Sequence, residues 1–357
     1  MCSYEQKLLP LGGLEWFRMR VTEKLRVVDA DTLLSTPLEK TAFVVDGLIP
    51  MGVTLLGGSS KIGKSWLMLW LGLQVARGDP LWGMATHRCD VLYLCLEDTL
   101  GRIQNRLYRL TNEAPAGLRF ATACGKLGSG LEEQILQALR DYPETRLVII
   151  DTLQRARDSR SAAGKNGLYS ADYDDMSALK DLADSQKIAI VLVHHLRKQQ
   201  DSSDPFNQLS GSTGITGAAD TNMVLQRLRG SNTATLLITG RDVDDQQLHL
   251  RFENLTWHLV EHIGSEEIFR EQIPPVLFRL VAFLKDRREW TGTATELLAA
   301  LGDRETPGNV VTKYLARYAE EVLRPAGIRY RNRRTGQSRL LHFTHDSCDG
   351  HDSNPDI

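Results

Sequence analysis

The chain has 357 residues, with 43 Lys and Arg against 45 Asp and Glu, a formal net charge of −2, 42% hydrophobic residues and 25% charged residues. This composition is that of an ordinary globular protein, so it excludes a chain disordered throughout, and the length predicts about two domains. No apolar run approaches the ~20 residues of a membrane helix, and the first residues do not resemble a signal peptide, so we expect a cytoplasmic chain with no membrane partner. The five cysteines form no CxxC pair and are expected to be reduced thiols.

After an N-terminal segment, residues 1–40, in which no chemistry is recognisable, apolar runs alternate with amphipathic stretches from about residue 53 to residue 252. This alternation predicts an α/β domain, over about 41–265, with a mostly parallel central sheet covered by helices. Strands are expected at 53–58, 91–97, 146–151, 188–195, 221–228 and 233–240, and helices at 65–78, 98–112 and 174–186. The last two strands and residues 248–260 are joined by short turns, so we expect antiparallel hairpins at the sheet edge.

A second, basic domain is expected after a boundary near residues 265–274, because Ile273-Pro274-Pro275 disfavours helix before it. Residues 271–345 carry a net charge of +5, residues 346–357 add four Asp and should be a disordered tail, and the first 270 residues carry −3. Predicted helices at 275–289, 294–302 and 308–323, followed by a strand pair at 327–343, indicate a winged-helix domain. The near-zero total charge therefore hides a module suited to nucleic acid.

The strongest motif is GSSKIGKS, residues 58–65, which fits the pattern G-x-x-x-x-G-K-[ST] and stands between a predicted strand and a predicted helix. Glycines let backbone N–H groups turn towards phosphate oxygens, and the helix N-terminus adds its positive dipole. We expect Lys64 to reach the β and γ phosphates of ATP and Ser65 to bind Mg²⁺; a Gly-rich turn with a chance match is the alternative. The expected nucleotide-binding residues here are Gly58, Ser59, Ser60, Lys61, Ile62, Gly63, Lys64, Ser65 and Trp66.

Two carboxylates follow predicted strands that should end at the same sheet edge as this loop. Asp151 ends an apolar strand in the Walker B pattern and is expected to hold Mg²⁺ with Ser65. Because Thr152 rather than a Glu follows Asp151, the base that activates water must come from elsewhere, and Glu97 is the candidate. Capping roles are the alternatives, and for the helix that begins near Thr99 we expect Asp98 to be the better cap.

These motifs, together with a fourth strand ending in His, the segment SGSTGITGAADTNMVL at 210–225 and a strand ending in TGR, resemble RecA-like ATPases. The resemblance covers about residues 41–262 and is greatest to the RepA-type hexameric replicative helicases of plasmids and mobile elements, with DnaB-type helicases and RecA recombinases further away. It implies a RecA-like P-loop NTPase fold, ATP hydrolysis and a ring of six subunits around DNA.

The resemblance also assigns roles to two further residues. In the family, the His that ends the fourth strand couples the γ-phosphate to a DNA-facing loop; here His194 or His195 could match, and His195 is preferred because it is nearer the strand end. The family places an arginine finger, which completes the neighbouring subunit's ATP site, where this chain has Arg241. The family usually has a basic residue two places before the finger, whereas this chain has Thr239. Arg229 and Arg251 are alternative fingers, and a surface ion pair is the non-catalytic alternative.

DNA contacts are expected on two long polar loops. One loop, residues 196–214, offers Arg197 and Lys198. The other, residues 154–175, offers the bases Arg155, Arg157, Arg160 and Lys165, with Tyr169 available for stacking. Single-stranded DNA would lie in the ring. Either loop could instead be plain flexible surface.

The basic domain is a second expected DNA site, there for duplex, although a winged helix can also bind protein. The expected contacts are Lys313, Tyr314 and Arg317 on its third helix and Arg331, Arg333, Arg334 and Arg339 around the turn NRRTG. His342, His345, Cys348 and His351 recur every third residue, but with no second cluster to close a zinc site we favour a disordered tail.

The sequence therefore predicts an ATP-hydrolysing, ring-forming DNA helicase that acts in replication or maintenance of a mobile element. Two alternatives are an ATP-dependent DNA-binding regulator and a recombinase-like filament.

Overall fold

The computed structural model describes residues 27–37, 41–157, 167–196, 204–209, 213–334 and 339–345. The chain divides into two compact units, residues 1–42 and residues 43–357. In the first unit the short helix α2 (Ala30–Ser35) begins at Asp29, whose carboxylate accepts a hydrogen bond of 2.9 Å from the Thr32 N–H. Within the part of the chain that the structure describes, no helix is long and apolar enough to cross a membrane.

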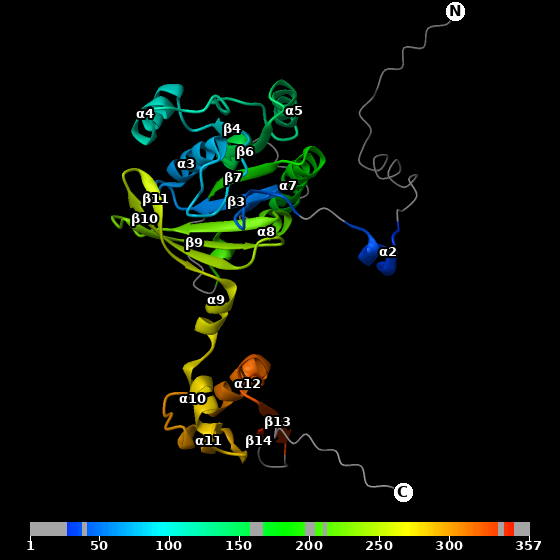
Figure 1. The fold of residues 1–357 in the computed structure, drawn as a ribbon, viewed down its shortest axis with the longest axis vertical. Coiled ribbons are helices and arrows are strands. Elements are labelled where there is room, and N and C mark those ends of the chain that lie inside the picture. Colours follow the sequence, from blue (N-terminus) through cyan, green and yellow to red (C-terminus); the bar gives the residue numbers. More distant parts are fainter. Residues whose placement is uncertain are drawn as a thin grey trace, which may run out of the picture. The chain divides into compact units, whose positions relative to one another are not determined.

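A nine-stranded sheet organises residues 43–264 (Figure 1), and its strand order is β11-β10-β9-β8-β3-β7-β6-β4-β5. The six strands from β8 to β5 are parallel, and the last three strands in sequence are antiparallel. The parallel strands are β3 (Gly52–Gly58), β4 (Asp90–Cys95), β5 (Leu118–Ala121), β6 (Thr145–Asp151), β7 (Ala189–His195) and β8 (Thr221–Gln226). The antiparallel strands are β9 (Thr233–Gly240), β10 (Gln246–Glu253) and β11 (Thr256–Ile263). The expected mostly parallel sheet with an antiparallel edge is confirmed.

Helices cover both faces of this sheet because its strands are apolar on both faces. One face packs against α3 (Lys64–Arg77) and α4 (Leu100–Leu110) in a core that contains Leu67 and Ile103. The opposite face packs against α5 (Leu131–Asp141), α6 (Leu153–Ala156), α7 (Gly167–Gln186) and α8 (Thr213–Ala218). A short helix, η2 (Pro205–Gln208), precedes α8, and a small hairpin of β1 (Phe43–Val45) and β2 (Ile49–Pro50) precedes β3.

Residues 273–345, here called the C-terminal module, have a core of their own made by Leu280, Leu297, Leu315 and Phe343 among others. The module contains α10 (Pro275–Leu284), β12 (Glu289–Thr293), α11 (Ala294–Ala300), α12 (Gly308–Val322), β13 (Ile328–Arg334) and β14 (Arg339–His345). Its three strands form an antiparallel sheet in the order β12-β14-β13. The three expected helices and the strand pair are present, and β12 is an additional strand.

Several elements were not predicted. Strand β5, helix α5 and the β1/β2 hairpin lie in segments whose periodicity is weak or short, and α9 (Ser265–Gln272) occupies the expected boundary. A proline restricts mainly the residue before it, so α9 can end one residue before Ile273 and leave that residue extended. Cys89, Cys95 and Cys124 are free thiols, as expected, while Cys2 and Cys348 lie outside the described residues.

Candidate active site

The period of two along parallel strands places three polar side chains on one face at one edge of the sheet. In β7, Val191 and Val193 belong to the core on the α3 face, whereas Leu192 belongs to the core on the opposite face. Because successive side chains alternate, His195 shares the α3 face. In β6, Ile149 belongs to the same core, so Asp151, two residues later, also lies on the α3 face. Cys95, the last residue of β4, belongs to this core too, and Glu97 follows it by two residues.

The loop between β3 and α3 wraps around the side chain of Lys64. Lys61 and Gly63 have φ angles of 63° and 108°, in the left-handed region that turns the backbone sharply. A Cβ atom on Gly63 would lie 2.9 Å from the Trp257 ring, whose Nε1 donates a hydrogen bond of 3.2 Å to the Gly63 carbonyl. The second loop glycine is therefore required both by its backbone conformation and by a packed tryptophan.

Lys64 is a buried cation at the centre of the loop. Its Nζ donates hydrogen bonds to the carbonyls of Gly58 at 2.6 Å and Ser59 at 2.9 Å, and it lies 3.3 Å from Nδ1 of His195. Burial lowers the pKa of Lys64 to about 8, although the carboxylates of Asp151 and Glu97 act in the opposite direction. An anion bound in the loop would favour the charged ammonium, so the loop fits a phosphate.

Asp151 is buried and held by two hydroxyl groups. The Tyr93 hydroxyl donates a hydrogen bond of 2.9 Å to Oδ2, and the Ser65 side chain forms a second hydrogen bond with the same carboxylate. Burial raises the pKa of Asp151, against the lowering effects of these hydrogen bonds and of Lys64. A divalent cation would offset this cost of burial, so the Ser65 and Asp151 oxygens fit the expected Mg²⁺ ligands.

Glu97 and His195 lie close together in the site. Oε1 of Glu97 accepts a hydrogen bond of 3.2 Å from the Thr152 hydroxyl, and Oε2 lies 3.8 Å from Nε2 of His195. The other ring nitrogen of His195 lies 3.4 Å from the Ser60 hydroxyl. His195 therefore contacts both the loop and the proposed base, and it is the histidine of the pair that the structure brings to the pocket.

These residues line a cavity of about 630 Å³, which is large enough for a nucleotide. Four of the lining residues were not predicted from the sequence: Arg102, Arg106, Arg227 and Phe252. The spacing of the first two could have revealed them, since arginines at i+4 and i+8 from Asp98 lie near one face of a helix.

Asp98 does not cap α4, and that expectation was wrong. The cap is Thr99, whose hydroxyl accepts a hydrogen bond of 3.3 Å from the Arg102 N–H. Asp98 instead pairs with Arg102 at 2.9 Å and with Arg106 at 2.5 Å. Helix α4 begins one residue later than expected, so Thr99 and not Asp98 precedes its first residue. At that position a short polar side chain can accept a hydrogen bond from an N–H of the first helical turn.

Aromatic rings and arginines border the cavity in two places. The Arg106 guanidinium lies 5.4 Å from the Trp66 ring centroid. The Arg227 guanidinium lies 5.0 Å from the Phe252 ring centroid and donates a hydrogen bond of 3.2 Å to the Ile62 carbonyl. Arg227, which follows β8, therefore links that strand to the phosphate loop.

Arg241 is far from this cavity within its own chain. Its guanidinium donates to Asp220 and to the Gly217 carbonyl, both at 3.2 Å, and its side chain is 57% exposed. Asp220 also accepts a hydrogen bond from the Val53 N–H, at the amino end of β3, whereas the phosphate loop follows the carboxyl end. The length of β3 separates the two ends by about 20 Å, so Arg241 cannot complete its own site.

The alternative finger residues occupy the opposite edge. Arg251 lies on β10 in register with Thr233, the first residue of β9, and it pairs with Glu253 at 3.6 Å. Arg229 is exposed in the turn between β8 and β9. Both therefore lie towards the end of the sheet where their own chain's phosphate loop is found.

The expected DNA contacts of the two polar loops are only partly described. Arg157 is 15% exposed and forms an ion pair of 3.0 Å with Asp175, whereas the Arg155 side chain is exposed, 3.9 Å from Glu97. Arg197 and Lys198, like Arg160 and Lys165, lie outside the described residues, as does the side chain of Tyr169.

In the C-terminal module, Lys313 and Arg317 are exposed on α12, whereas Tyr314 packs against the module's core. Arg331 and Arg333 are exposed on β13, which ends at Arg334, opposite Arg339 of β14. Among the described residues, no group of three His, Cys, Asp or Glu side chains could hold a metal ion, and Cys348 and His351 are not described.

A phosphate loop, a Walker-type carboxylate and a polar cluster at the carboxyl edge of a parallel sheet define the class of P-loop ATPases with a RecA-like fold. Residues 20–201 match the family model described as an AAA domain. Since the match covers half of the chain, the protein belongs to the AAA domain family. No curated protein matches the chain.

Three solved structures are similar to parts of the chain. A DnaB-like replicative helicase aligns with a TM-score of 0.50 and 16% sequence identity, over 70% of this chain and 71% of that chain. A separately solved ATPase domain aligns with a TM-score of 0.46 and 16% identity, over 59% of this chain and 85% of that chain. The RadB recombinase aligns with a TM-score of 0.43 and 16% identity, over 60% of this chain and 93% of that chain. The likeness to the DnaB-like helicase shows that the fold is shared.

The pKa of Lys64 predicts a pH dependence of nucleotide binding. Because bound phosphate favours the charged ammonium of Lys64, ATP affinity should hardly change with pH near pH 7. Above pH 8 the free protein loses this charge, and the affinity should fall by up to about tenfold per pH unit. Binding should take up a proton at pH 9 and almost none at pH 7, which calorimetry in buffers of different ionisation enthalpy measures. Equal proton uptake at the two pH values would contradict this assignment.

The Tyr93 hydroxyl should support Asp151. Tyr93→Phe removes one donor from a buried carboxylate, so the free energy of unfolding should fall by about 1–3 kcal/mol, and half-maximal ATPase activity should need more Mg²⁺. Denaturant unfolding and a Mg²⁺ titration measure the two effects. Tyr108→Phe, at an exposed tyrosine of α4, is the matched control and should change neither quantity.

Proposed function

We propose that this protein is an ATP-driven motor of the RepA helicase type, which assembles into a ring of six subunits and acts on DNA in replication or maintenance of a mobile element. The observation that carries the proposal is the convergence of Lys64, Asp151, Glu97 and His195 on one cavity at the carboxyl edge of the sheet. These four residues lie at or just after the ends of four strands that are consecutive in the sheet, β3, β7, β6 and β4.

The cavity residues would have different roles in ATP hydrolysis. The loop amides and Lys64 would bind the β and γ phosphates, and Ser65 and Asp151 would hold Mg²⁺, which supplies positive charge to the transferred phosphate. Glu97 would accept the proton of the attacking water, since its carboxylate lines the cavity and is oriented by Thr152. His195 contacts Lys64 and Glu97. It would couple the presence of the γ-phosphate to the conformation of the loop that follows β7.

The position of Arg241 supports assembly. An exposed arginine at the amino edge of the sheet can serve an ATP site only in another copy of the chain, where it would stabilise charge on the transferred phosphoryl group. A head-to-tail contact of this kind produces a closed ring when its rotation closes. The proposal of six subunits rests on the resemblance described for the sequence.

DNA contact is proposed for two regions. The C-terminal module has the element order helix, strand, helix, helix, strand, strand, and its net positive charge with exposed Lys313, Arg317, Arg331 and Arg333 supports a winged helix that binds duplex. Arg155, together with Arg197 and Lys198, is proposed to contact single-stranded DNA inside the ring; the ion pair of Arg157 favours a structural role for that residue.

A DNA-binding regulator with the same ATPase core is the second candidate, because the basic C-terminal module alone would suffice for site-specific binding. A recombinase-like filament is the third. The three candidates differ in how ATP turnover responds to DNA and in the native mass of the assembly.

ATP hydrolysis measured with and without single-stranded DNA, beside native mass, tests the proposal. The wild-type chain should form a hexamer whose turnover rises with single strands, and Lys64→Ala should abolish turnover. A stable monomer whose turnover ignores single strands would rule out the helicase and favour the regulator, whereas an open series of masses would favour the filament.

Subunit mixing tests whether Arg241 acts in trans. Arg241→Ala and Glu97→Gln chains should each be inactive, but mixed rings should recover about a quarter of the sites, because an intact pocket must meet an intact arginine. Lys64→Ala mixed with Glu97→Gln is the control: both defects lie in the same pocket, so no activity should return. Equal failure of both mixtures would contradict the action of Arg241 in trans.

A further inference from the structure

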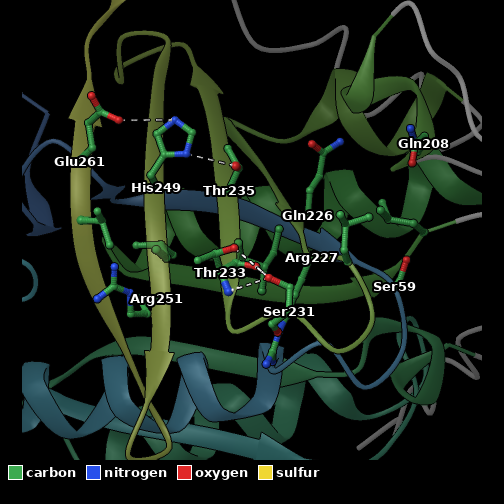
Figure 2. A pocket seen from close by; sticks show the side chains of 16 residues that line it. Ser59, Gln208, Gln226, Arg227, Ser231, Thr233, Thr235, His249, Arg251 and Glu261 are labelled. Carbon is green, nitrogen blue, oxygen red and sulfur yellow. Dashed lines mark hydrogen bonds and ion pairs between the residues drawn. The ribbon is translucent and has the colours of Figure 1, made fainter.

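A second cavity begins where the nucleotide cavity ends. It has a volume of about 730 Å³ and lies against strands β8 to β11 (Figure 2). Ser59 and Leu196 line it, while the adjacent residues Ser60 and His195 line the nucleotide cavity, and Arg227 lines both. Whatever occupies this second cavity, here called the groove, therefore lies directly beside the phosphate loop.

The groove combines polar, charged and aliphatic side chains. Figure 2 shows His249 between Thr235, at 3.4 Å, and Glu261, at 3.9 Å, with Arg251 further along the same strand. Two aliphatic side chains, Leu228 and Val260, line the groove although they are 81% and 56% exposed. The groove therefore offers both exposed apolar area and an arginine, a combination that a second protein chain can cover.

One carboxylate in the groove and another beside it make nucleic acid a poor occupant. Glu261 lines the groove, and Glu253 lies 3.6 Å from Arg251. Both would repel a phosphate backbone, whose binding depends on neutralisation by cations. A short acidic peptide segment with its own arginine would instead match the mixed charges.

The chain itself has such a segment at the other edge of the sheet. Residues 241–245, here called the acidic turn, read Arg-Asp-Val-Asp-Asp, and Asp244 and Asp245 are exposed beside Arg241. The Arg251 ion pair with Glu253 is half exposed on both sides, so it costs little to exchange for a new partner. The acidic turn and the groove are thus complementary in charge but lie at opposite ends of one sheet.

We infer that the groove is the docking site for the acidic turn of a second copy of this chain. Asp244 and Asp245 of one copy pair with Arg251 of the next, and this contact delivers Arg241 into the adjoining nucleotide cavity. The inference rests on the proposed function, whose trans-acting Arg241 it supplies with a partner surface.

The contacts of Asp220 are compatible with release of Arg241 for this purpose. Asp220 is 7% exposed and accepts hydrogen bonds from Lys180 at 2.5 Å and from the Val53 N–H at 3.0 Å. When Arg241 turns towards a neighbouring copy, Asp220 keeps a cation and an amide donor. Its burial therefore does not hold Arg241 in place.

A charge-reversal cycle tests the docking. Arg251→Glu and the pair Asp244→Arg with Asp245→Arg should each reduce the assembled fraction and DNA-stimulated ATPase activity about tenfold, because like charges meet. The triple variant should recover most of both losses. Arg140→Glu, at an exposed arginine of α5, is the matched control and should leave both unchanged. Native mass spectrometry and steady-state turnover measure the outcome, and circular dichroism confirms folding of each variant.

Four results would overturn the inference. Arg251→Glu could leave assembly intact, or the folded triple variant could show no recovery. Alternatively, Arg251→Glu could weaken binding to a fluorescent single strand without changing native mass, which would assign the groove to nucleic acid. A wild-type chain that hydrolyses ATP as a monomer would overturn the docking but not the ATPase activity. Conversely, a triple variant that assembles, in a protein that shows no ATP turnover, would overturn the proposed motor but not the docking.

Discussion

The buried ammonium group of Lys64 is the constraint on which the site depends. A charge removed from water must be compensated, and here two backbone carbonyls accept from Nζ while the carboxylates of Asp151 and Glu97 raise the pKa that burial lowers. The carbonyls can converge on Nζ only because the loop adopts left-handed angles at Lys61 and Gly63. The sharp loop, the nearby carboxylates and the affinity for phosphate are therefore aspects of one electrostatic arrangement.

The sheet supplies the carboxylates at fixed places. Parallel strands end at one edge, and alternation sends every second side chain to the same face. This regularity explains why the sequence predicted the strands, the phosphate loop, Asp151 and Glu97. Each depends on a local apolar run and on the residue that follows it. The antiparallel edge was predictable for the same reason, because short turns leave two strands no other way to pair.

Features that depend on packing between distant segments could not be predicted in this way. The choice between His194 and His195 depends on which face α3 covers, which only the assembled core decides. Phe252 and Arg227 reach the cavity through a strand order in which β8 and β10 lie beyond β3. The cap of α4 was predicted wrongly because the Asp98 carboxylate pairs with Arg102 and Arg106 and not with the N–H groups of the helix N-terminus. Local rules fail where a tertiary partner competes.

The network around Asp220 compensates a second buried charge, at the far edge of the sheet. A buried carboxylate that served only to anchor Arg241 would lose its counter-ion whenever the arginine moved, at a cost of several kcal/mol. Lys180 and the Val53 amide remove that cost, since they keep Asp220 paired in either position of the arginine. One cation, Lys64, is thus buried and hydrogen-bonded within its own phosphate loop, whereas another, Arg241, is exposed at the opposite edge. This asymmetry suits the proposed site shared between two copies, in which the buried charge would bind the nucleotide and the exposed charge would act in the neighbouring copy.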